Sequence, residues 1–193
     1  MSADLSFRYP ARPQPAVTLV AALGLARGRV HEASGPARQS FAVLVAAAMA
    51  GPVLWIAPLW QEALLHPDGV ARFFDPARLL LIRPQRAPDL LWAMEEALRS
   101  GAAPLVVAEL GEPPGLTPVR RLLLAAESSG TAPLGLLLTP GEGGANGVES
   151  RWHMAPRYQA GITGWRLERR RARAQKPQAW HLSHREGRLR IDG

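Results

Sequence analysis

The chain contains no cysteine and only one lysine, Lys176, among its 193 residues. The absence of cysteine excludes disulfides, thiolate catalysis and cysteine-ligated zinc. A phosphate-binding loop needs a lysine after its glycines to hold the β- and γ-phosphates of a nucleotide, and residues 1–175 contain none. The composition therefore argues against nucleotide hydrolysis and favours binding as the function.

An unbroken apolar run that could cross a membrane is also missing. Residues 41–60 carry no charge, but Gly51 and Pro52 interrupt the run at its centre and Pro58 near its end. A buried helix, a turn and a buried strand fit this pattern better than a membrane span. Residues 1–15 lack the basic and then apolar pattern of a secretion signal. We therefore expect a cytoplasmic protein with no membrane contact.

Charge is distributed unevenly along the chain. Residues 1–150 contain 12 arginines and 13 acidic residues, a net charge of −1. Residues 151–193 contain 11 basic and three acidic residues, a net charge of +8. This asymmetry is typical of a protein that contacts a polyanion or an acidic protein surface.

Short apolar runs alternate with helical patterns between residues 28 and 140. The apolar runs predict strands that are covered on both faces, at Val30–Ser34, Val53–Ala57, Leu79–Ile82, Leu105–Leu110 and Leu134–Leu138. Apolar residues at helical spacing predict helices at Ala37–Ala50, Pro88–Arg99 and from Thr117 to a stop at Gly130. The alternation predicts an α/β fold with a mostly parallel sheet and helices on both faces.

The two ends of the chain read differently from this α/β core. Residues 1–27 form a lead-in, with a short helix expected at Ala16–Ala26. Residues 141–193 begin with a flexible glycine-rich loop, Gly141–Gly147, after which apolar and polar residues alternate. This alternation predicts an antiparallel β extension with an apolar inner face, an arginine outer face and a hairpin turn at Glu186-Gly187. The expected division is thus 1–27, 28–140 and 141–193.

From Gly28 to about Arg173, roughly three quarters of the protein, the chain resembles the RecA-like core. It most closely resembles the ImuA family, RecA-like accessory proteins of mutagenic DNA repair in bacteria. Four segments support this resemblance through their order and spacing together. They are GRVHEASGP (Gly28–Pro36), WAMEEALRSGA (Trp92–Ala102), LVVAEL (Leu105–Leu110) and GWRLERRRAR (Gly164–Arg173).

The resemblance also identifies departures from an ATPase. Where a RecA-type protein continues its Gly-Pro turn into a Gly-Lys-Thr cradle, this chain has a degenerate phosphate loop that includes Gly35, Pro36, Arg38 and Ser40. The water-polarising acid would fall near Leu59, which cannot take a proton. Glu109 stands at the place of the metal-orienting acid, and we expect a vestigial or structural role for it. We predict no ATP hydrolysis, no tight nucleotide binding and no cofactor.

The basic C-terminal region is the remaining candidate for function. Arginine suits phosphates because its guanidinium binds them bidentately, and the interleaved Trp152, Tyr158 and Trp165 could stack bases. The same cations could instead dock an acidic protein or form a solvated edge. Histidines at 181 and 184 lie on opposite faces of a strand, so no metal site is expected. The candidate contact residues are Arg166, Arg169, Arg170, Arg171, Arg173, Lys176, Arg188 and Arg190.

The resemblance implies a noncatalytic adaptor in SOS-induced, error-prone translesion synthesis. Such a protein links an ImuB-like, Y-family-related subunit to an error-prone replicative-type DNA polymerase, and it contacts RecA or DNA. Two alternatives stay open. One is a SulA-like inhibitor of cell division that binds protein and not DNA. The other is a divergent RecA-like NTPase that borrows an arginine from a neighbouring subunit.

Overall fold

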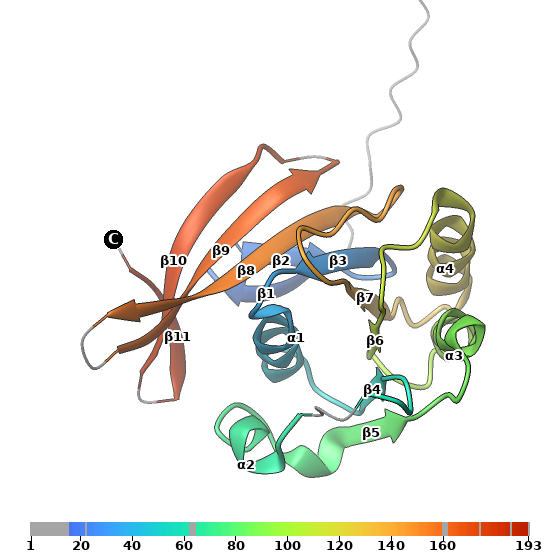
Figure 1. Cartoon of the computed structure of the whole chain (residues 1–193), viewed down its shortest axis with the longest axis horizontal. Helices are drawn as coiled ribbons and strands as arrows, with labels where there is room; N and C mark the ends of the chain where they lie inside the picture. Colours follow the sequence, from blue (N-terminus) through green and yellow to red (C-terminus); the bar gives the residue numbers. More distant parts are fainter. Residues whose placement is uncertain are drawn as a thin grey trace, which may run out of the picture.

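A nine-stranded mixed sheet forms the centre of the computed structural model, which describes residues 16–21, 23–61, 65–159, 162–173, 175–185 and 187–192 (Figure 1). The strand order is β11-β10-β9-β8-β3-β7-β6-β4-β5. Six neighbouring strands are parallel: β8 (Ser150–Gln159), β3 (Val30–Ser34), β7 (Leu134–Leu138), β6 (Leu105–Glu109), β4 (Val53–Ile56) and β5 (Leu79–Ile82).

The other three strands continue the sheet in antiparallel fashion. They are β9 (Ile162–Ala172), β10 (Gln178–Arg185) and β11 (Arg188–Asp192). Because β8 pairs with β3 on one side and with β9 on the other, the parallel and antiparallel parts are one continuous sheet. The predicted α/β class and the C-terminal β extension are confirmed; residue 186 of the expected hairpin turn lies outside the described residues.

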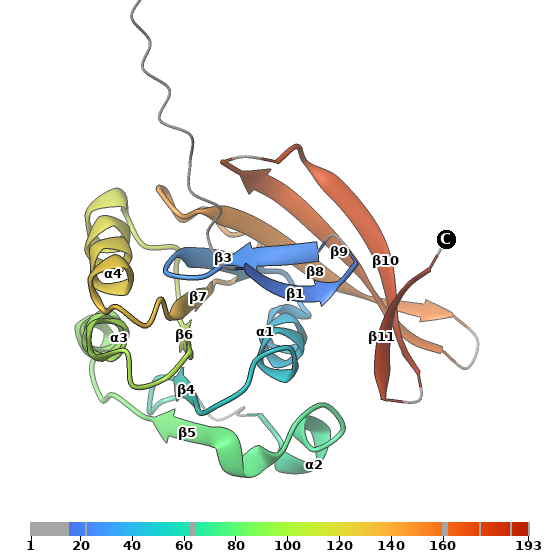
Figure 2. The ribbon, with the colours of Figure 1, turned by 180° about the vertical axis from the view of Figure 1, so that it is seen from behind.

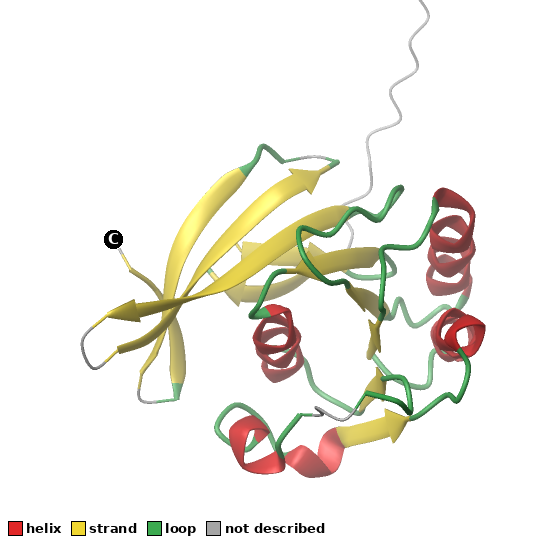
Figure 3. Cartoon of the chain, viewed as in Figure 1, coloured by secondary structure: helices red, strands yellow, loops and turns green. Residues whose placement is uncertain are grey.

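Helices cover both faces of the parallel part (Figures 2 and 3). On one face, α1 (Arg38–Ala47) packs with the short α2 (Pro67–Val70), which precedes a 3-10 turn at Pro76–Arg78. On the other face, α3 (Ala87–Ser100) and α4 (Leu116–Ser128) lie side by side over a second apolar cluster. Gly101 ends α3 with a φ of 63°, a conformation that glycine adopts without strain.

The predicted helix at Ala16–Ala26 is wrong. The segment forms an antiparallel hairpin of β1 (Ala16–Val20) and β2 (Leu23–Ala26), which is a separate two-stranded sheet. Val17, Leu23 and Leu25 are buried in the apolar cluster on the α1 side. The alternating placement of these side chains lets a two-stranded ribbon bury them on one face, and this tertiary packing overrides the helix propensity of the alanines.

The start of α4 also differs from expectation. Its N-cap is Gly115 rather than Thr117, and no side chain caps the helix. None of the helices in the described part of the chain is long and apolar enough to cross a membrane.

Candidate functional site

The segment that the sequence predicts to be a degenerate phosphate loop joins β3 to α1. Gly35 has a φ of +88°, and a Cβ atom there would lie 2.5 Å from the carbonyl oxygen of Met154 and 2.7 Å from Nε2 of His153. Glycine is therefore required both by the backbone conformation and by the close approach of β8. Arg38 begins α1, and its Nη1 donates to the Gly35 carbonyl at 3.3 Å rather than reaching outward. Ser40 is partly buried within α1.

The N–H groups of this loop donate hydrogen bonds to backbone carbonyls of the protein itself. The N–H of Gly35 donates to the carbonyl of Gly141 at 3.0 Å, and that of Ala37 donates to the carbonyl of Met154 at 3.0 Å. The N–H of Arg38 donates back to Gly35 at 3.2 Å, and Pro36 has no N–H. In a working phosphate loop such groups point at phosphate oxygens. Here they are already satisfied within the fold.

Glu109 is buried at the end of β6 and is held by three neutral side chains. Its carboxylate accepts hydrogen bonds from Gln39 Nε2 at 2.9 and 3.1 Å, from Trp55 Nε1 at 2.7 Å and from Gln61 Nε2 at 2.9 Å. These donors come from α1, from β4 and from the segment after β4. The carboxylate therefore ties together the ends of three elements, the geometry of a structural hydrogen-bonding group.

Leu59 follows β4 at the position expected for the water-polarising acid. Its side chain is about half exposed, and its N–H donates to the carbonyl of Pro84. Close by is a crevice of about 580 Å³ at the carboxyl ends of the parallel strands, where α/β proteins commonly bind ligands. Its lining is mostly apolar and includes Arg38, Trp60, Gln61, Leu90, Leu110 and Pro140.

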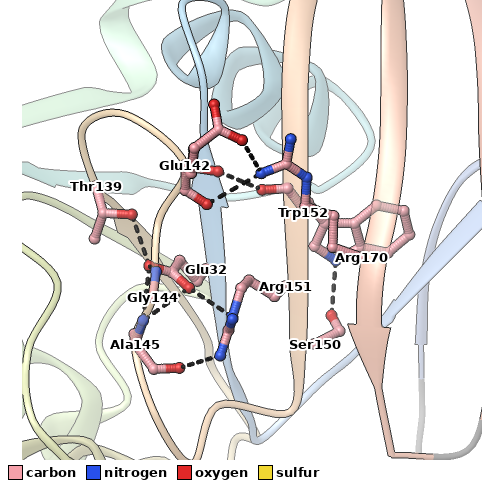
Figure 4. A network of polar contacts seen from close by, with 10 residues as sticks. Glu32, Thr139, Glu142, Gly144, Ala145, Ser150, Arg151, Trp152 and Arg170 are labelled. Carbon is pink, nitrogen blue, oxygen red and sulfur yellow. Dashed lines mark hydrogen bonds and ion pairs between the residues drawn. The ribbon is translucent and has the colours of Figure 1, made fainter. Parts of the chain in front are cut away.

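A buried glutamate on β3 anchors the glycine-rich loop, as Figure 4 shows. Glu32 is fully buried and accepts hydrogen bonds from Thr139 Oγ1 at 2.7 Å and from the N–H groups of Gly144 and Ala145 at 2.8 and 3.0 Å. Arg151 Nε lies 3.1 Å from Oε2 of Glu32, and Arg151 Nη2 donates to the carbonyl of Ala145. The glycine-rich loop, which the sequence predicts to be flexible, is thus held in place by Glu32 and Arg151.

The start of the same loop is held by Arg170 (Figure 4). Arg170 Nη1 donates to the carboxylate of Glu142 at 2.6 Å and to its carbonyl at 3.2 Å. His153 Nε2 lies 3.7 Å from the Glu142 carboxylate. Burial lowers the pKa of His153, and the charge of Arg170 lowers it further. These contacts fix the start of the glycine-rich loop, where the carbonyl of Gly141 accepts the hydrogen bond from the N–H of Gly35.

Arg169, one of the candidate contact residues, does not lie on the protein surface. It is buried, and its guanidinium carbon lies 5.7 Å from the ring centroid of Trp152 and 5.1 Å from that of Trp180. It donates to the carbonyl of Lys176 at 3.0 and 3.2 Å and to Gln175 Oε1 at 2.6 Å. Burial lowers its pKa. Arg169 therefore joins the hydrophobic core to the segment between β9 and β10.

The other candidate cations fall into two groups. Arg166 and Arg170 pair with Glu168 at 2.9 and 3.1 Å, and the hydrogen bond from Arg170 lowers the pKa of that carboxyl. Arg173 lies 3.6 Å from Glu149. The side chains of the remaining candidates are exposed, namely Arg171, Lys176, Arg188 and Arg190.

The aromatic side chains proposed for base stacking are mostly unavailable to a ligand. Trp152 is fully buried and stacks on Phe41 at 5.6 Å, and Trp165 is 7% exposed. Tyr158, in contrast, is 86% exposed. Trp152 and Trp165 thus belong to the core on the α1 side of the sheet and are not placed to stack bases.

The described histidines form no metal site. Among these residues, no group of three or more His, Asp or Glu side chains could hold a metal ion. His31 is buried, with Nδ1 at 2.7 Å from Ser150 Oγ and Nε2 at 2.9 Å from the carbonyl of Ala26. Because Trp152 Nε1 donates to Ser150 Oγ, the hydroxyl can donate to His31, whose other nitrogen then donates to Ala26. Burial lowers the pKa of His31 from 6.5 to about 4.

Comparison with curated proteins finds Protein ImuA from two strains of Caulobacter vibrioides, NA1000 / CB15N and ATCC 19089 / CIP 103742 / CB 15. Each is 32% identical over 153 residues, covering 70% of this chain and 62% of the relative. The chain belongs to the ImuA family. The resemblance found in the sequence, to a family associated with translesion synthesis, is confirmed. This ImuA-related chain spans less than two thirds of the length of those relatives, and no family model matches it.

Several structurally important residues were missed by the sequence analysis of this ImuA-family chain. Gln39, Trp55 and Gln61 hold Glu109, and Glu32 pairs with Arg151. Glu32 had a usable signal, because an acidic residue in a strand that is covered on both faces must find a buried partner. The partners of Glu109 had no such signal, since they are brought together only by the strand order.

Proposed function

We propose that this ImuA-family protein is a noncatalytic, cytoplasmic adaptor in SOS-induced, error-prone translesion synthesis. It links an ImuB-like, Y-family-related subunit with an error-prone replicative-type DNA polymerase, and RecA and DNA are further partners. One observation supports the noncatalytic part of this proposal. The carbonyls of Gly141 and Met154 already accept hydrogen bonds from the N–H groups of Gly35 and Ala37.

Nucleotide binding would require this arrangement to be broken. A triphosphate would have to displace two carbonyls, one of which belongs to a loop that Glu32 and Arg170 hold in place. Displacing each carbonyl would break one hydrogen bond, at a cost of about 0.5–1.5 kcal/mol. There is no lysine before residue 176 to offset that cost by binding the β- and γ-phosphates.

The adaptor part is supported by exposed apolar side chains around the edge strand β5. Trp92 is 61% exposed and Trp60 is 56% exposed, and Leu80 and Leu81 of β5 are about half exposed. Exposed clusters of large apolar residues are typical of protein-binding surfaces, and tryptophan is enriched among residues that dominate binding energy. A rigid α/β frame with such a surface suits a protein that acts by contact.

Calorimetry tests the noncatalytic part. Titration of Mg²⁺–ATP into the protein is expected to give no saturable heat at micromolar concentration, and phosphate release should equal the background. Saturable binding would overturn the proposal. Phosphate release above background that Glu109→Gln abolishes would establish the divergent NTPase in its place.

Capture of purified partners tests the adaptor part. The protein should retain an ImuB-like subunit and an error-prone polymerase, and the double variant Trp60→Ala, Trp92→Ala should reduce retention of at least one of them. Leu124→Ala, which removes an exposed leucine from α4, is the matched control. Retention of neither partner, or binding to a cell-division GTPase without DNA affinity, would contradict the adaptor and favour the SulA-like alternative.

A further inference from the structure

One face of the antiparallel part of the sheet is not covered by any helix in the described part of the chain. The apolar cluster beneath α3 and α4 takes its buried strand residues from β3, β4, β6 and β7. On the opposite face, the inner residues of β8–β10 pack into the α1-side cluster. In Figure 1, α3 and α4 lie at the far end of the molecule from β9–β11. We name the uncovered side of β8–β11 the outer face.

The outer face is strongly basic. The pairing register places Arg166 opposite His181, Ser183 opposite Arg190 and Arg185 opposite Arg188, so that the outer residues of β9, β10 and β11 line up across the strands. Against these cations stand Glu168, Asp192 and, from the glycine-rich loop, Glu142. Apart from Arg151, which pairs with the buried Glu32, the arginines on this face in the described part of the chain are Arg157, Arg166, Arg170, Arg171, Arg185, Arg188 and Arg190, which gives seven cations against three acids.

A shift in register concentrates charge at one end of this face. Between β8 and β9, Arg151 lies opposite Arg171 and Trp152 lies opposite Arg169, so Arg170 has no residue opposite it. This extra residue lets Arg170 and Arg171 both avoid the core side that Arg169 occupies. Arg170 is held by Glu142 and Glu168, whereas Arg171 is exposed.

The outer face lacks what a protein partner or a single strand would need. Among the described side chains, Tyr158 and Ile191 are the large apolar ones exposed on β8–β11, and their register places both on the opposite, inner side. Protein interfaces depend on buried aromatic or aliphatic anchors. Proteins that bind single-stranded nucleic acid stack its bases on aromatic side chains. Guanidinium groups alone instead suit a phosphate backbone.

We infer that the outer face of β8–β11 binds the phosphate backbone of double-stranded DNA and does not read its sequence. The inference deepens the proposed adaptor role and rests on it, because it gives the adaptor its own attachment to DNA. The exposed guanidiniums of Arg171, Arg185 and Arg188 make the contacts. Binding is therefore salt-sensitive, independent of sequence and no weaker for a duplex than for a single strand.

Fluorescence anisotropy with a short labelled duplex and its matching single strand tests this site without any partner protein. The triple variant Arg171→Gln, Arg185→Gln, Arg188→Gln should lose about tenfold or more in duplex affinity at moderate salt. Its slope of log affinity against log salt should fall by about 2.7, since each phosphate contact contributes about 0.9. The control variant Arg72→Gln, Arg86→Gln, Arg120→Gln removes the same charge from exposed positions elsewhere and should bind as the wild type does.

Three results would overturn the inference: unchanged duplex binding by the triple variant, an equal loss in the control variant, or binding to the single strand alone. Circular dichroism of each variant shows whether the fold is kept. If the triple variant does not fold, the single variants Arg171→Gln and Arg188→Gln carry the same test. Because no ImuB-like subunit or polymerase is present, failure here leaves the adaptor proposal standing, and failure of partner capture leaves this result standing.

Discussion

The parallel and antiparallel halves of the sheet handle their polar residues in opposite ways. In the parallel half, Glu109 and Glu32 are buried and each is satisfied by side chains or backbone groups of the protein. In the antiparallel half, many arginines end in solvent. Within one continuous sheet, acidic groups of the parallel strands are therefore part of the internal structure, whereas the antiparallel strands expose charge to solvent.

The largest expected effect on stability concerns Glu32. If this residue contributed little to stability, the contrast between the two halves of the sheet would not hold. Glu32→Ala removes the ion-pair partner of the half-buried Arg151 and the buried acceptor of the Thr139 hydroxyl and of the N–H groups of Gly144 and Ala145. We therefore expect a loss of about 3–5 kcal/mol in the free energy of unfolding. Urea denaturation measures it. Glu112→Ala, at an exposed acid, should change stability by less than about 0.5 kcal/mol. A loss for Glu32→Ala as small as that of Glu112→Ala would contradict the internal role.

The next effect concerns pH and His31. Burial lowers the pKa of the folded-state imidazole to about 4, whereas the unfolded chain takes up the proton near 6.5. The unfolded state therefore binds more protons between these values, so stability falls as the pH drops from 6.5 to 4, by about 3 kcal/mol from this residue. Arg29, whose charge also disfavours the proton, acts in the same direction.

Urea denaturation between pH 7 and pH 4 measures this dependence. His31→Gln removes the titrating group, and its stability should vary less steeply across that range than that of the wild type. Other carboxylates titrate in both proteins, so the difference between the two slopes is the informative quantity. Parallel slopes would show that His31 does not link the hairpin to the sheet through a neutral ring.

The smallest of the three effects sharpens the boundary within the arginine tract. Arg169→Ala removes contacts with two tryptophan rings and hydrogen bonds to the segment after β9, and should cost about 2–3 kcal/mol. Arg171→Ala, two residues away and exposed, should cost less than about 0.5 kcal/mol. Thermal denaturation of the pair distinguishes them. Similar costs would mean that the two arginines share one environment.

The sequence predicted most of the parallel half because β4, β5 and β7 are short apolar runs, and because amphipathic helices follow β3, β5 and β6. The hairpin at Ala16–Ala26 was missed because its alanine-rich sequence is also compatible with a helix, and because its packing against the α1-side core is a tertiary effect. Arg169 could have been placed correctly, since Trp165, Leu167 and Arg169 alternate on one face of β9. Arg169, Arg170 and Arg171 are identical in the sequence, so the sequence does not show that the alternation shifts by one residue at Arg170.

The contacts of Glu109 and of the phosphate loop could not be predicted in the same way. They join residues that are up to about 120 positions apart in the chain and that meet only once the strand order is fixed. The sequence identified the altered loop through its missing glycine and lysine. It could not show that the carbonyls of Gly141 and Met154 accept hydrogen bonds from the N–H groups of Gly35 and Ala37.

The filled loop has a consequence for any attempt to revive hydrolysis by protein engineering. Grafting a Gly-Lys-Thr segment after Pro36 would supply a cation and a hydroxyl, yet the carbonyls of Gly141 and Met154 would still accept hydrogen bonds from the N–H groups of Gly35 and Ala37. Reversal would also require the β7–β8 connection to be rebuilt and its tether to Glu32 cut. Under the proposed noncatalytic role, the closed architecture of this loop would oppose ATPase chemistry in addition to the missing lysine.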